Sequence, residues 1–498
     1  MSQTTVTDTE MQPRIAVMGK VDSRQSSRGL EVHTDQDRAP NNVASTDRIQ
    51  PLPLDTSEPP SPRDIHGIKW AFAVTAILSS VFLFALDQTI VADVQPNIIA
   101  EFKSISKLPW LSVSFLLGTA STNLLWGRIY SQFNPKWIYV LCVYIGIIGV
   151  VFGFGTVWAF YINLCIGGAF APAYFFLLPS RDLRPGMKFR DRMKAVDWIG
   201  NTLVIGMYVS ILMAISFGGT TFSWNSAQEI ALFVVAGVLF IALSIHQVWS
   251  DWQNRMFPVH FLKNRGLLIQ FLVGASAGTS SFVTIYFIPL YFQFVQDTNS
   301  LLAGVRLLPF IGSLAVFTML NGHLMARLGY SMPWYVTGSV LVIAANAMLY
   351  RIDLSTSNGY IYGAMILNGI GTGMFLNAPF AVAQWLAPRK ETSSAVGFIM
   401  CSRGGGLAIA LSIANAIFLN LADNRIRHDF PDLDKTEIQS LTSGSGSTLL
   451  KTLNPDQQQQ VLAAIVFAIS RVFITSIASG CFCLILSLFM DRKKHKLG

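Results

Sequence analysis

Asp87 is the acidic residue that lies well inside an apolar segment of this sequence. The segment 70–91 has about 22 residues, enough for one helical crossing of a hydrocarbon layer of about 30 Å. A carboxylate there is costly unless it is paired, hydrated or protonated. An apolar surrounding favours the protonated carboxyl group and a nearby arginine favours the ionised one, so alternation between them would make Asp87 a proton switch. Permanent pairing that fixes helix packing is the structural alternative.

Three arginines lie in other apolar segments, namely Arg306, Arg403 and Arg471. An unpaired buried charge costs several kcal/mol, about 3–5 where a buried pair is broken, so one or more of these arginines should face a cavity, a carboxylate or a ligand. Arg403 is our candidate partner of Asp87 in proton coupling, or a substrate contact. Arg306 is a candidate for the substrate cavity, although Arg306 and Arg471 could also reach the outer surface by extending along the helix.

Polar uncharged residues inside apolar segments provide the remaining cavity candidates, which are Gln88, Thr89, Asn368, Asn377 and Gln384. Hydrogen bonding between helices is the alternative role for each of them. The glycine-rich stretch 369–373 resembles a nucleotide-binding loop, but its apolar surroundings indicate close helix packing. The run 404–406, directly after Arg403, would let another backbone approach closely or let the helix bend. We predict no catalytic residues, no metal site and no cofactor, and therefore no enzyme.

The composition indicates what must position these residues. Of 498 residues, 52% are apolar and 13% are charged, whereas about 25% are charged in a typical soluble protein. We therefore predict an all-α polytopic membrane protein, and we attribute the net charge of +8 to loop topology rather than to nucleic-acid binding. About twelve apolar segments are long enough to cross a membrane: 70–91, 109–129, 137–156, 158–179, 197–217, 229–249, 268–293, 302–323, 332–351, 359–385, 395–418 and 462–489.

Lysine and arginine are distributed unevenly between the connections. With the N-terminus inside, about twenty of them lie on the inner side near the spans and about seven on the outer side. This asymmetry predicts that both termini face the cytoplasm. The stretch 137–180 carries no charge and is about twice as long as one span. We therefore expect two spans there, joined by a tight turn at 153–156.

The expected organisation has six parts. They are a disordered cytoplasmic tail (1–65), an incomplete N-terminal helical half (66–179), a linker loop with a central pair of spans (180–266), a C-terminal helical half (267–418), an outer loop (419–461), and a last span with a cytoplasmic tail (462–498). Asn454 and Pro455 are a predicted helix start within the outer loop.

Several motifs together resemble the major facilitator superfamily, in particular its fourteen-span drug:proton antiporter branch, close to fungal toxin and secondary-metabolite efflux pumps. The motifs are LDQTIV at 86–91, GRIYSQFNPK at 127–136, FYINLCIG at 160–167, AGVRLLP at 303–309 and RGGG at 403–406. The resemblance implies a helical bundle with a cavity between two halves. It also implies a gating loop after the second span, to which we assign Gly127, Arg128 and Lys136.

The sequence departs from this family pattern in two places. In the loop at 127–136, Ser131 stands where the family has an acidic residue. Asn134 and Pro135 stand where it has glycine and arginine. The third span also runs almost directly into the family's sixth helix, so the fourth and fifth helices are missing. Loss of one outward and one inward helix preserves the topology. An ordinary twelve-span transporter is the competing interpretation, because 322–329 echoes the loop at 127–136 six spans later.

The function implied by the resemblance is proton-coupled efflux of small amphipathic molecules such as toxins, secondary metabolites and drugs. Its partners would be the small-molecule substrate, protons and the lipid bilayer, without nucleic acid. We expect an integral protein of the plasma membrane, with the vacuolar membrane as the alternative. Uptake of a siderophore or a sugar-like solute is a rival function, and a transport-inactive truncated family member is another.

Overall fold

A computed structural model of the chain describes helices that all belong to one compact unit, 63–498. The described residues are 67–79, 117–118, 121–123, 125–130, 132–153, 161–178, 180, 186–250, 255, 257–388, 391–442, 450 and 452–490.

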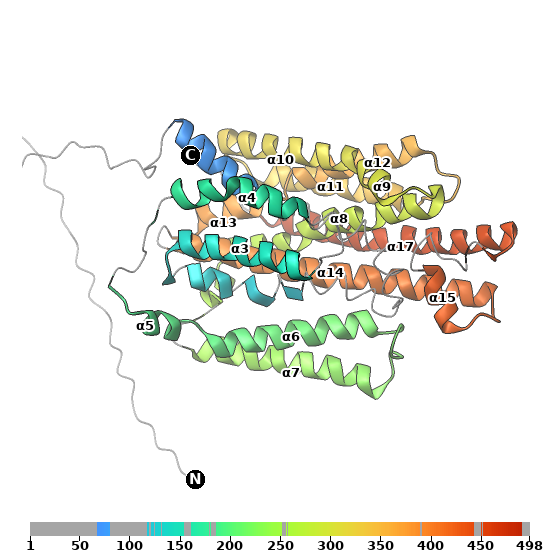
Figure 1. Cartoon of the computed structure of the whole chain (residues 1–498), viewed down its shortest axis with the longest axis horizontal. Coiled ribbons are helices and arrows are strands. Elements are labelled where there is room, and N and C mark those ends of the chain that lie inside the picture. Colours follow the sequence, from blue (N-terminus) through green and yellow to red (C-terminus); the bar gives the residue numbers. More distant parts are fainter. Residues whose placement is uncertain are drawn as a thin grey trace, which may run out of the picture. The chain divides into compact units, whose positions relative to one another are not determined.

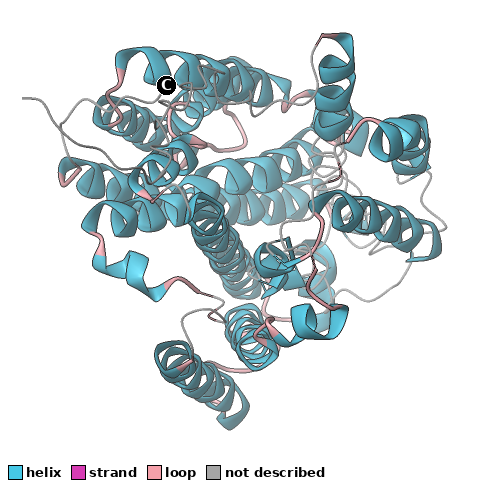
Figure 2. Ribbon diagram, turned by 90° about the vertical axis from the view of Figure 1, so that its left-hand side faces the viewer, coloured by secondary structure: helices cyan, strands magenta, loops and turns pink. Residues whose placement is uncertain are grey.

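Helices account for nearly all of the regular structure in these ranges (Figures 1 and 2). They are α3 (Pro135–Gly153), α4 (Tyr161–Phe176), α5 (Phe189–Lys194), α6 (Trp198–Phe217), α7 (Ala227–Trp249), η3 (Val259–Lys263), α8 (Arg265–Gln296), α9 (Ser300–Val305), α10 (Leu308–Leu328), α11 (Met332–Leu349), α12 (Asn358–Gly373), α13 (Ala378–Leu386), α14 (Thr392–Asp429), α15 (Lys435–Thr442) and α17 (Pro455–Leu488). Strand-like pairing in the described residues is limited to an isolated bridge between Gly218 and Phe222. The all-α prediction is confirmed.

Within the described residues, eight helical stretches are long and apolar enough to cross a membrane. They correspond to the eight predicted segments from 197 onward. Three shorter apolar helices coincide with parts of the first, third and fourth predicted segments: Ile68–Ser79, Pro135–Ile145 and Cys165–Phe176. Most of the second segment, 109–129, lies outside the described residues. The full number of twelve spans therefore stays a prediction.

The uncharged stretch from 137 to 180 forms two helices, α3 and α4, as predicted. Aromatic side chains from the start of α3 meet others from the end of α4, so the two helices run in opposite directions. Tyr139 and Tyr174 have ring centres 5.6 Å apart. The Tyr174 hydroxyl is 2.7 Å from the hydroxyl of Ser79, which ties the helix Ile68–Ser79 to this pair. Residues 154–156 of the predicted turn lie outside the described residues.

The C-terminal helices pack around α8, which is the most buried of the long helices in the described residues. It contacts α14 on one side and α17 on another, while α12 lies against both α10 and α11. Phe287 of α8, Phe418 of α14 and Phe473 of α17 contribute to one apolar core. The helices α6 and α7 pair with each other, and α6 also contacts α14. Figure 1 shows α6 and α7 side by side along the edge of this group.

Two predicted spans are interrupted where proline occurs. The segment 302–323 divides into α9 and α10, and the segment 359–385 divides into α12 and α13. Pro309 and Pro379 each lie in the first turn of the second helix. Proline lacks an amide hydrogen and clashes with the preceding turn, so it can begin a helix but rarely continues one. The breaks place Arg306 and Asn377 at helix junctions rather than on helix faces.

Helices α14 and α17 extend well into the region predicted as the outer loop, 419–461. Helix α14 reaches Asp429, and ion pairs one turn apart support its last turns: Arg425 with Asp429 at 3.8 Å, and Arg427 with Asp423 at 3.3 Å. The predicted helix start at Asn454 is confirmed, because Asn454 and Gln457 form a reciprocal capping box at the start of α17.

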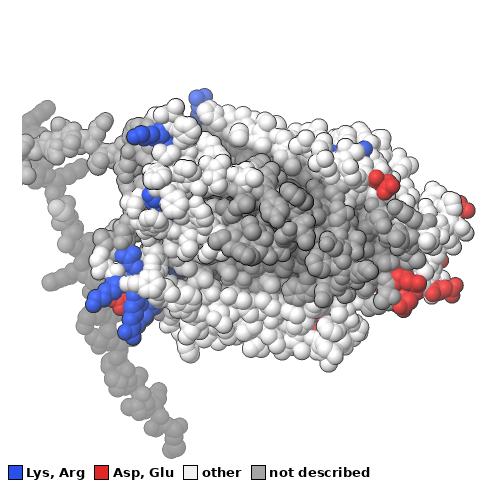
Figure 3. Space-filling model, viewed as in Figure 1, with Lys and Arg blue, Asp and Glu red and all other residues white. Residues whose placement is uncertain are grey.

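Charged side chains are distributed unevenly between the two ends of the helices. On the face shown in Figure 3, most lysine and arginine side chains gather at the end where α5 lies, and most acidic side chains at the end where α15 lies. Helix α5 itself carries Arg190, Arg192 and Lys194. The sequence predicted the uneven distribution of lysine and arginine from the composition of the connections.

Candidate functional site

Arg403 of α14 contacts Asn377 at the junction between α12 and α13. Arg403 Nη1 donates a hydrogen bond to Asn377 Oδ1 at 3.2 Å. The guanidinium carbon lies 5.9 Å from the centre of the Phe380 ring, which adds a cation–π contact. Asn377 is the residue directly before the first turn of α13, and the break in front of Pro379 places it there. The pair offers a cation and an amide to a substrate or to a carboxylate.

The glycines that follow Arg403 fix where α14 lies. A Cβ atom on Gly406 would stand 2.7 Å from Cα of Ala275 in α8, and one on Gly405 would overlap the Tyr208 hydroxyl of α6. Glycine is therefore required for this approach, as the sequence predicted for the run 404–406. The Ser402 hydroxyl also donates to the Phe271 carbonyl of α8. Arg403 is thus carried by a stretch of helix that two neighbours hold closely.

Asn368 takes part in a buried network that joins α8, α11 and α12. Its amide nitrogen donates to Thr284 Oγ1 at 2.7 Å, and its oxygen accepts a hydrogen bond from Asn346 Nδ2 at 3.0 Å. One turn further along α12, Thr372 lies 3.0 Å from the Ser280 hydroxyl. All five side chains are buried. This geometry supports hydrogen bonding between helices for Asn368, and its role in a substrate path stays a prediction.

The glycine-rich stretch 369–373 packs against neighbouring backbones. A Cβ atom on Gly371 would lie 2.8 Å from the Gly338 carbonyl oxygen of α11, and one on Gly373 would lie 2.8 Å from the Leu314 carbonyl oxygen of α10. Both approaches are too close for any side chain. The prediction of close helix packing, rather than a nucleotide loop, is confirmed.

The cavity candidates Arg306 and Gln384, and the third intramembrane arginine Arg471, have surroundings of their own. Arg306, at the α9–α10 junction, donates to the Gln296 side-chain oxygen, and its guanidinium carbon is 4.9 Å from the centre of the Phe292 ring. Gln384 is exposed on α13. Arg471 stacks over Tyr350, with its guanidinium carbon 4.2 Å from the ring centre.

The predicted gating loop contacts α5. Gly127 and Arg128 lie in a short helix at 125–130, and the Lys136 ammonium group lies 5.7 Å from the Trp137 ring centre. Between them, the Gln132 carbonyl accepts a hydrogen bond from Arg192 Nη1 of α5 at 3.2 Å. Arg192 therefore joins α5 to the connection at 127–136 through a main-chain oxygen. Ser131, at the family's acidic position, lies outside the described residues.

Asp87, Gln88 and Thr89 also lie outside the residues that the structure describes. The proposed pairing of Asp87 with Arg403 therefore stays a prediction.

Two further carboxylates emerge from the structure. Asp197 caps α6, and its side chain accepts hydrogen bonds from the Gly200 amide at 2.7 Å and from Gln247 Nε2 at 2.8 Å, with His246 Nε2 at 2.8 Å. Glu229, in the first turn of α7, is 0% exposed, and its carboxylate oxygens have no hydrogen-bond partner among the described residues. Each of the two acids lies at the start of an apolar segment. For Asp197, the histidine at 246 was the available signal.

Comparison with known proteins identifies relatives along most of the chain. An MFS-type transporter, pgmG, of Aspergillus terreus is 39% identical, with 87% of this chain and 90% of the relative covered. Efflux pump DEP3 of Fusarium langsethiae is 34% identical, covering 87% and 92%. Efflux pump alnA of Emericella nidulans is also 34% identical, covering 88% and 93%.

The alignment with the Aspergillus terreus protein contains more positions than this chain supplies. It runs over 504 positions, whereas 87% of 498 residues is about 433 residues, so about 71 aligned positions face no residue of this chain. Two membrane helices with their loops would have a similar length, at roughly 20 residues for each crossing.

A family model described as Major Facilitator Superfamily matches residues 76–411, which is more than half of the chain. Its match includes the Arg403–Asn377 pair, the network around Asn368 and the predicted gating loop. With the helical architecture and the three relatives, this match shows that the chain belongs to the major facilitator superfamily and is a secondary transporter.

Proposed function

We propose that this transporter exports small amphipathic molecules in exchange for protons, with Asp87 as the protonation site and Arg403 as the cation of the substrate cavity. The observation that carries export is the similarity, over 87% of the chain, to relatives whose names describe efflux pumps of fungi. Proton coupling is supported by an acid inside the first apolar segment, since such a group can be neutral or ionised according to its surroundings.

The proposed site needs a cation whose charged form is stabilised inside an apolar helical bundle. The surroundings of Arg403 provide this stabilisation. Asn377 holds its guanidinium from one side and Phe380 covers it, while no carboxylate of the described residues lies within ion-pair distance. A cation in that state favours an anionic partner. Ionised Asp87 and an acidic group on the substrate would bind Arg403 alternately. Competition between them would couple proton uptake to release of the substrate.

We propose that the protein resides in the plasma membrane with both termini in the cytoplasm. The gathering of lysine and arginine at the end where α5 lies supports this orientation, because basic residues accumulate on the cytoplasmic side (Figure 3).

The test is efflux of the amphipathic dye rhodamine 6G from a yeast strain that lacks its own drug pumps. Cells expressing the wild-type chain should lose preloaded dye faster when the outside is acidic, and a protonophore should abolish the difference. Asp87→Asn should remove this pH dependence, whereas Asp87→Glu should retain part of it. An unchanged pH dependence in Asp87→Asn would remove Asp87 from the mechanism.

A transport-inactive family member is the second candidate, and the surplus of about 71 aligned positions in the first relative favours it. Sequencing the transcript around the codons for 154–158 distinguishes the two. A coding segment for two additional apolar helices, absent from the present sequence, would support export. A contiguous transcript, together with dye efflux no faster than in empty-vector cells at equal membrane expression, would support the inactive protein.

A further inference from the structure

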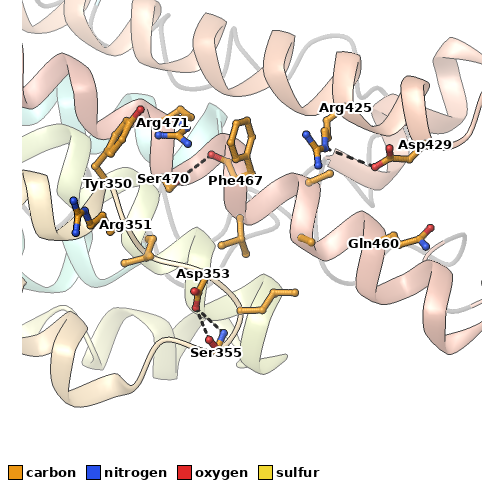
Figure 4. A pocket seen from close by; sticks show the side chains of 15 residues that line it. Tyr350, Arg351, Asp353, Ser355, Arg425, Asp429, Gln460, Phe467, Ser470 and Arg471 are labelled. Atoms are coloured by element: carbon orange, nitrogen blue, oxygen red, sulfur yellow. Dashed lines mark hydrogen bonds and ion pairs between the residues drawn. The ribbon is translucent and has the colours of Figure 1, made fainter.

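An open pocket lies where the end of α11, the outer part of α14 and the middle of α17 meet (Figure 4). Its volume is about 880 Å³, within the range of about 300–1,000 Å³ that small-molecule sites usually have. Arginines come to it from three different elements: Arg351 follows α11, Arg425 is on α14 and Arg471 is on α17. This pocket is separate from the Arg403–Asn377 pair.

Two of these arginines form no ion pair with a carboxylate of the described residues. Arg425 is paired with Asp429 at 3.8 Å. Arg471 and Arg351 have no ion pair with a carboxylate in the part of the chain that the structure describes. The nearest acid along the chain from Arg351 is Asp353, whose carboxylate accepts hydrogen bonds from its own loop instead.

Aromatic rings hold the Arg471 guanidinium in place. Its central carbon lies 4.2 Å from the centre of the Tyr350 ring and 4.6 Å from that of Phe467, so the group stands between two aromatic faces. Figure 4 shows Arg471 and Phe467 on α17, with Tyr350 opposite. Stacking fixes the plane of the guanidinium but leaves its edge donors unused, and those donors match the oxygens of a phosphate or a carboxylate.

The pocket lies at the depth of a membrane surface. Helix α11 ends at Leu349 after 18 residues, which is about 27 Å and close to the hydrocarbon thickness of about 30 Å. Tyr350 and the arginine stacked on it therefore lie near the boundary. Below this level, α11 and α17 expose apolar side chains, among them Val340 and Ile474, which are 49% and 50% exposed. The site thus combines a cationic end with an apolar strip.

We propose that this pocket binds the anionic head group of an amphiphile whose apolar chain runs along α11 and α17. A phospholipid phosphate and a fatty-acid carboxylate share this chemistry. Arg351 and Arg471 would bind the head group, and the pocket would be wide enough for one such group beside Phe467.

The test titrates the purified full-length protein in dodecyl maltoside with two probes, dioleoyl phosphatidic acid and oleate, and counts bound molecules by native mass spectrometry. In the variant with both Arg351→Gln and Arg471→Gln, binding should weaken by about tenfold or more, because charge-assisted hydrogen bonds are lost. Arg427→Gln is the matched control, since Arg427 is on the same outer turn of α14 but does not line the pocket.

The two probes distinguish the sources of the head group. Arginine-dependent binding of phosphatidic acid alone assigns a phospholipid site, and arginine-dependent binding of oleate alone assigns a site for a fatty-acid carboxylate. Where the double variant does not fold, Arg351→Gln and Arg471→Lys are compared singly, and weaker binding is expected in each. Equal binding by wild type and pocket variants, or an equal loss in Arg427→Gln, would overturn the proposal.

Discussion

The Arg403 guanidinium donates a 3.2 Å hydrogen bond to the side-chain oxygen of Asn377 and so links α14 to the first turn of α13. A single interaction of this kind makes the effects of its two partners non-additive. We predict that Arg403→Gln and Asn377→Ala each slow rhodamine 6G efflux, Arg403→Gln by roughly tenfold or more, and that the double variant is no slower than Arg403→Gln alone. Initial efflux rates at equal membrane expression measure this.

Asn424→Ala is the matched control for that cycle, because Asn424 is exposed on the same helix α14 and far from the pair. Its efflux should equal that of the wild type. Losses that simply multiply in the double variant would show that Arg403 and Asn377 act independently, and the pair would then have no joint role.

The contact between α8 and α14 depends on glycine at 406. The added methyl group of Gly406→Ala would meet Ala275 backbone and side-chain atoms at 2.7–2.8 Å, so the helices must separate. We predict destabilisation by about 1–3 kcal/mol, measured as a lower melting temperature of the purified protein. Gly397→Ala tests the same exchange on the same helix in open space. It should be neutral or stabilising by up to about 1 kcal/mol, and a loss equal to that of Gly406→Ala would contradict the packing argument.

The long helices were predictable because their length and apolarity are set by the membrane alone. Segments from 197 onward became helices near their predicted positions, and the charge-free stretch from 137 became a pair of helices. The breaks near Pro309 and Pro379 were not predicted, since proline in a membrane span can be accommodated by neighbouring helices. Whether it interrupts the helix depends on packing that a single segment does not reveal.

The candidate site was predictable as a set of residue types but not as a set of pairs. Sequence alone identified Arg403 and Asn377. Their contact, however, requires the break before α13, which places Asn377 at the start of a helix instead of on the face of a continuous one. Asn368 illustrates the opposite case. It has the same residue type and a similar apolar surrounding as Asn377, but its neighbours on α8 and α11 satisfy its amide within the core.

Asn368 should therefore matter more for stability than for transport. Asn368→Leu removes the hydrogen bonds to Thr284 and Asn346, while Thr284 still donates to the Ser280 carbonyl and Asn346 to the Val342 carbonyl. Each lost hydrogen bond contributes about 0.5–1.5 kcal/mol, so a lower melting temperature is expected. The Michaelis constant for dye efflux in properly folded molecules should not change. A raised Michaelis constant with an unchanged melting temperature would instead place Asn368 in the substrate path.

The loop between α11 and α12 should respond to acid through Asp353. Hydroxyl groups of Ser355 and Thr356 each donate to its carboxylate at 2.8 Å, and these hydrogen bonds lower the pKa of Asp353 below its ordinary value. The ionised form is thus favoured in the folded loop. Its contribution to stability is complete above the unfolded pKa, about 3.9, and is lost as the pH falls through the lower folded value.

This dependence is measurable by amide hydrogen exchange of the loop 350–357 in detergent, between pH 5 and pH 2.5, after correction for the intrinsic rates. Protection of the wild-type loop should fall as the pH approaches the folded pKa, while Asp353→Asn should show low protection throughout. The Tyr291 hydroxyl also donates to the Asp353 main-chain oxygen at 2.8 Å, so the substitution loosens the loop without freeing it from α8. Asp432→Asn, at an exposed acid in the connection between α14 and α15, should leave the pH profile of this loop unchanged. An identical profile in wild type and Asp353→Asn would show that the carboxylate does not hold the loop, and the Tyr291 contact would then be its main restraint.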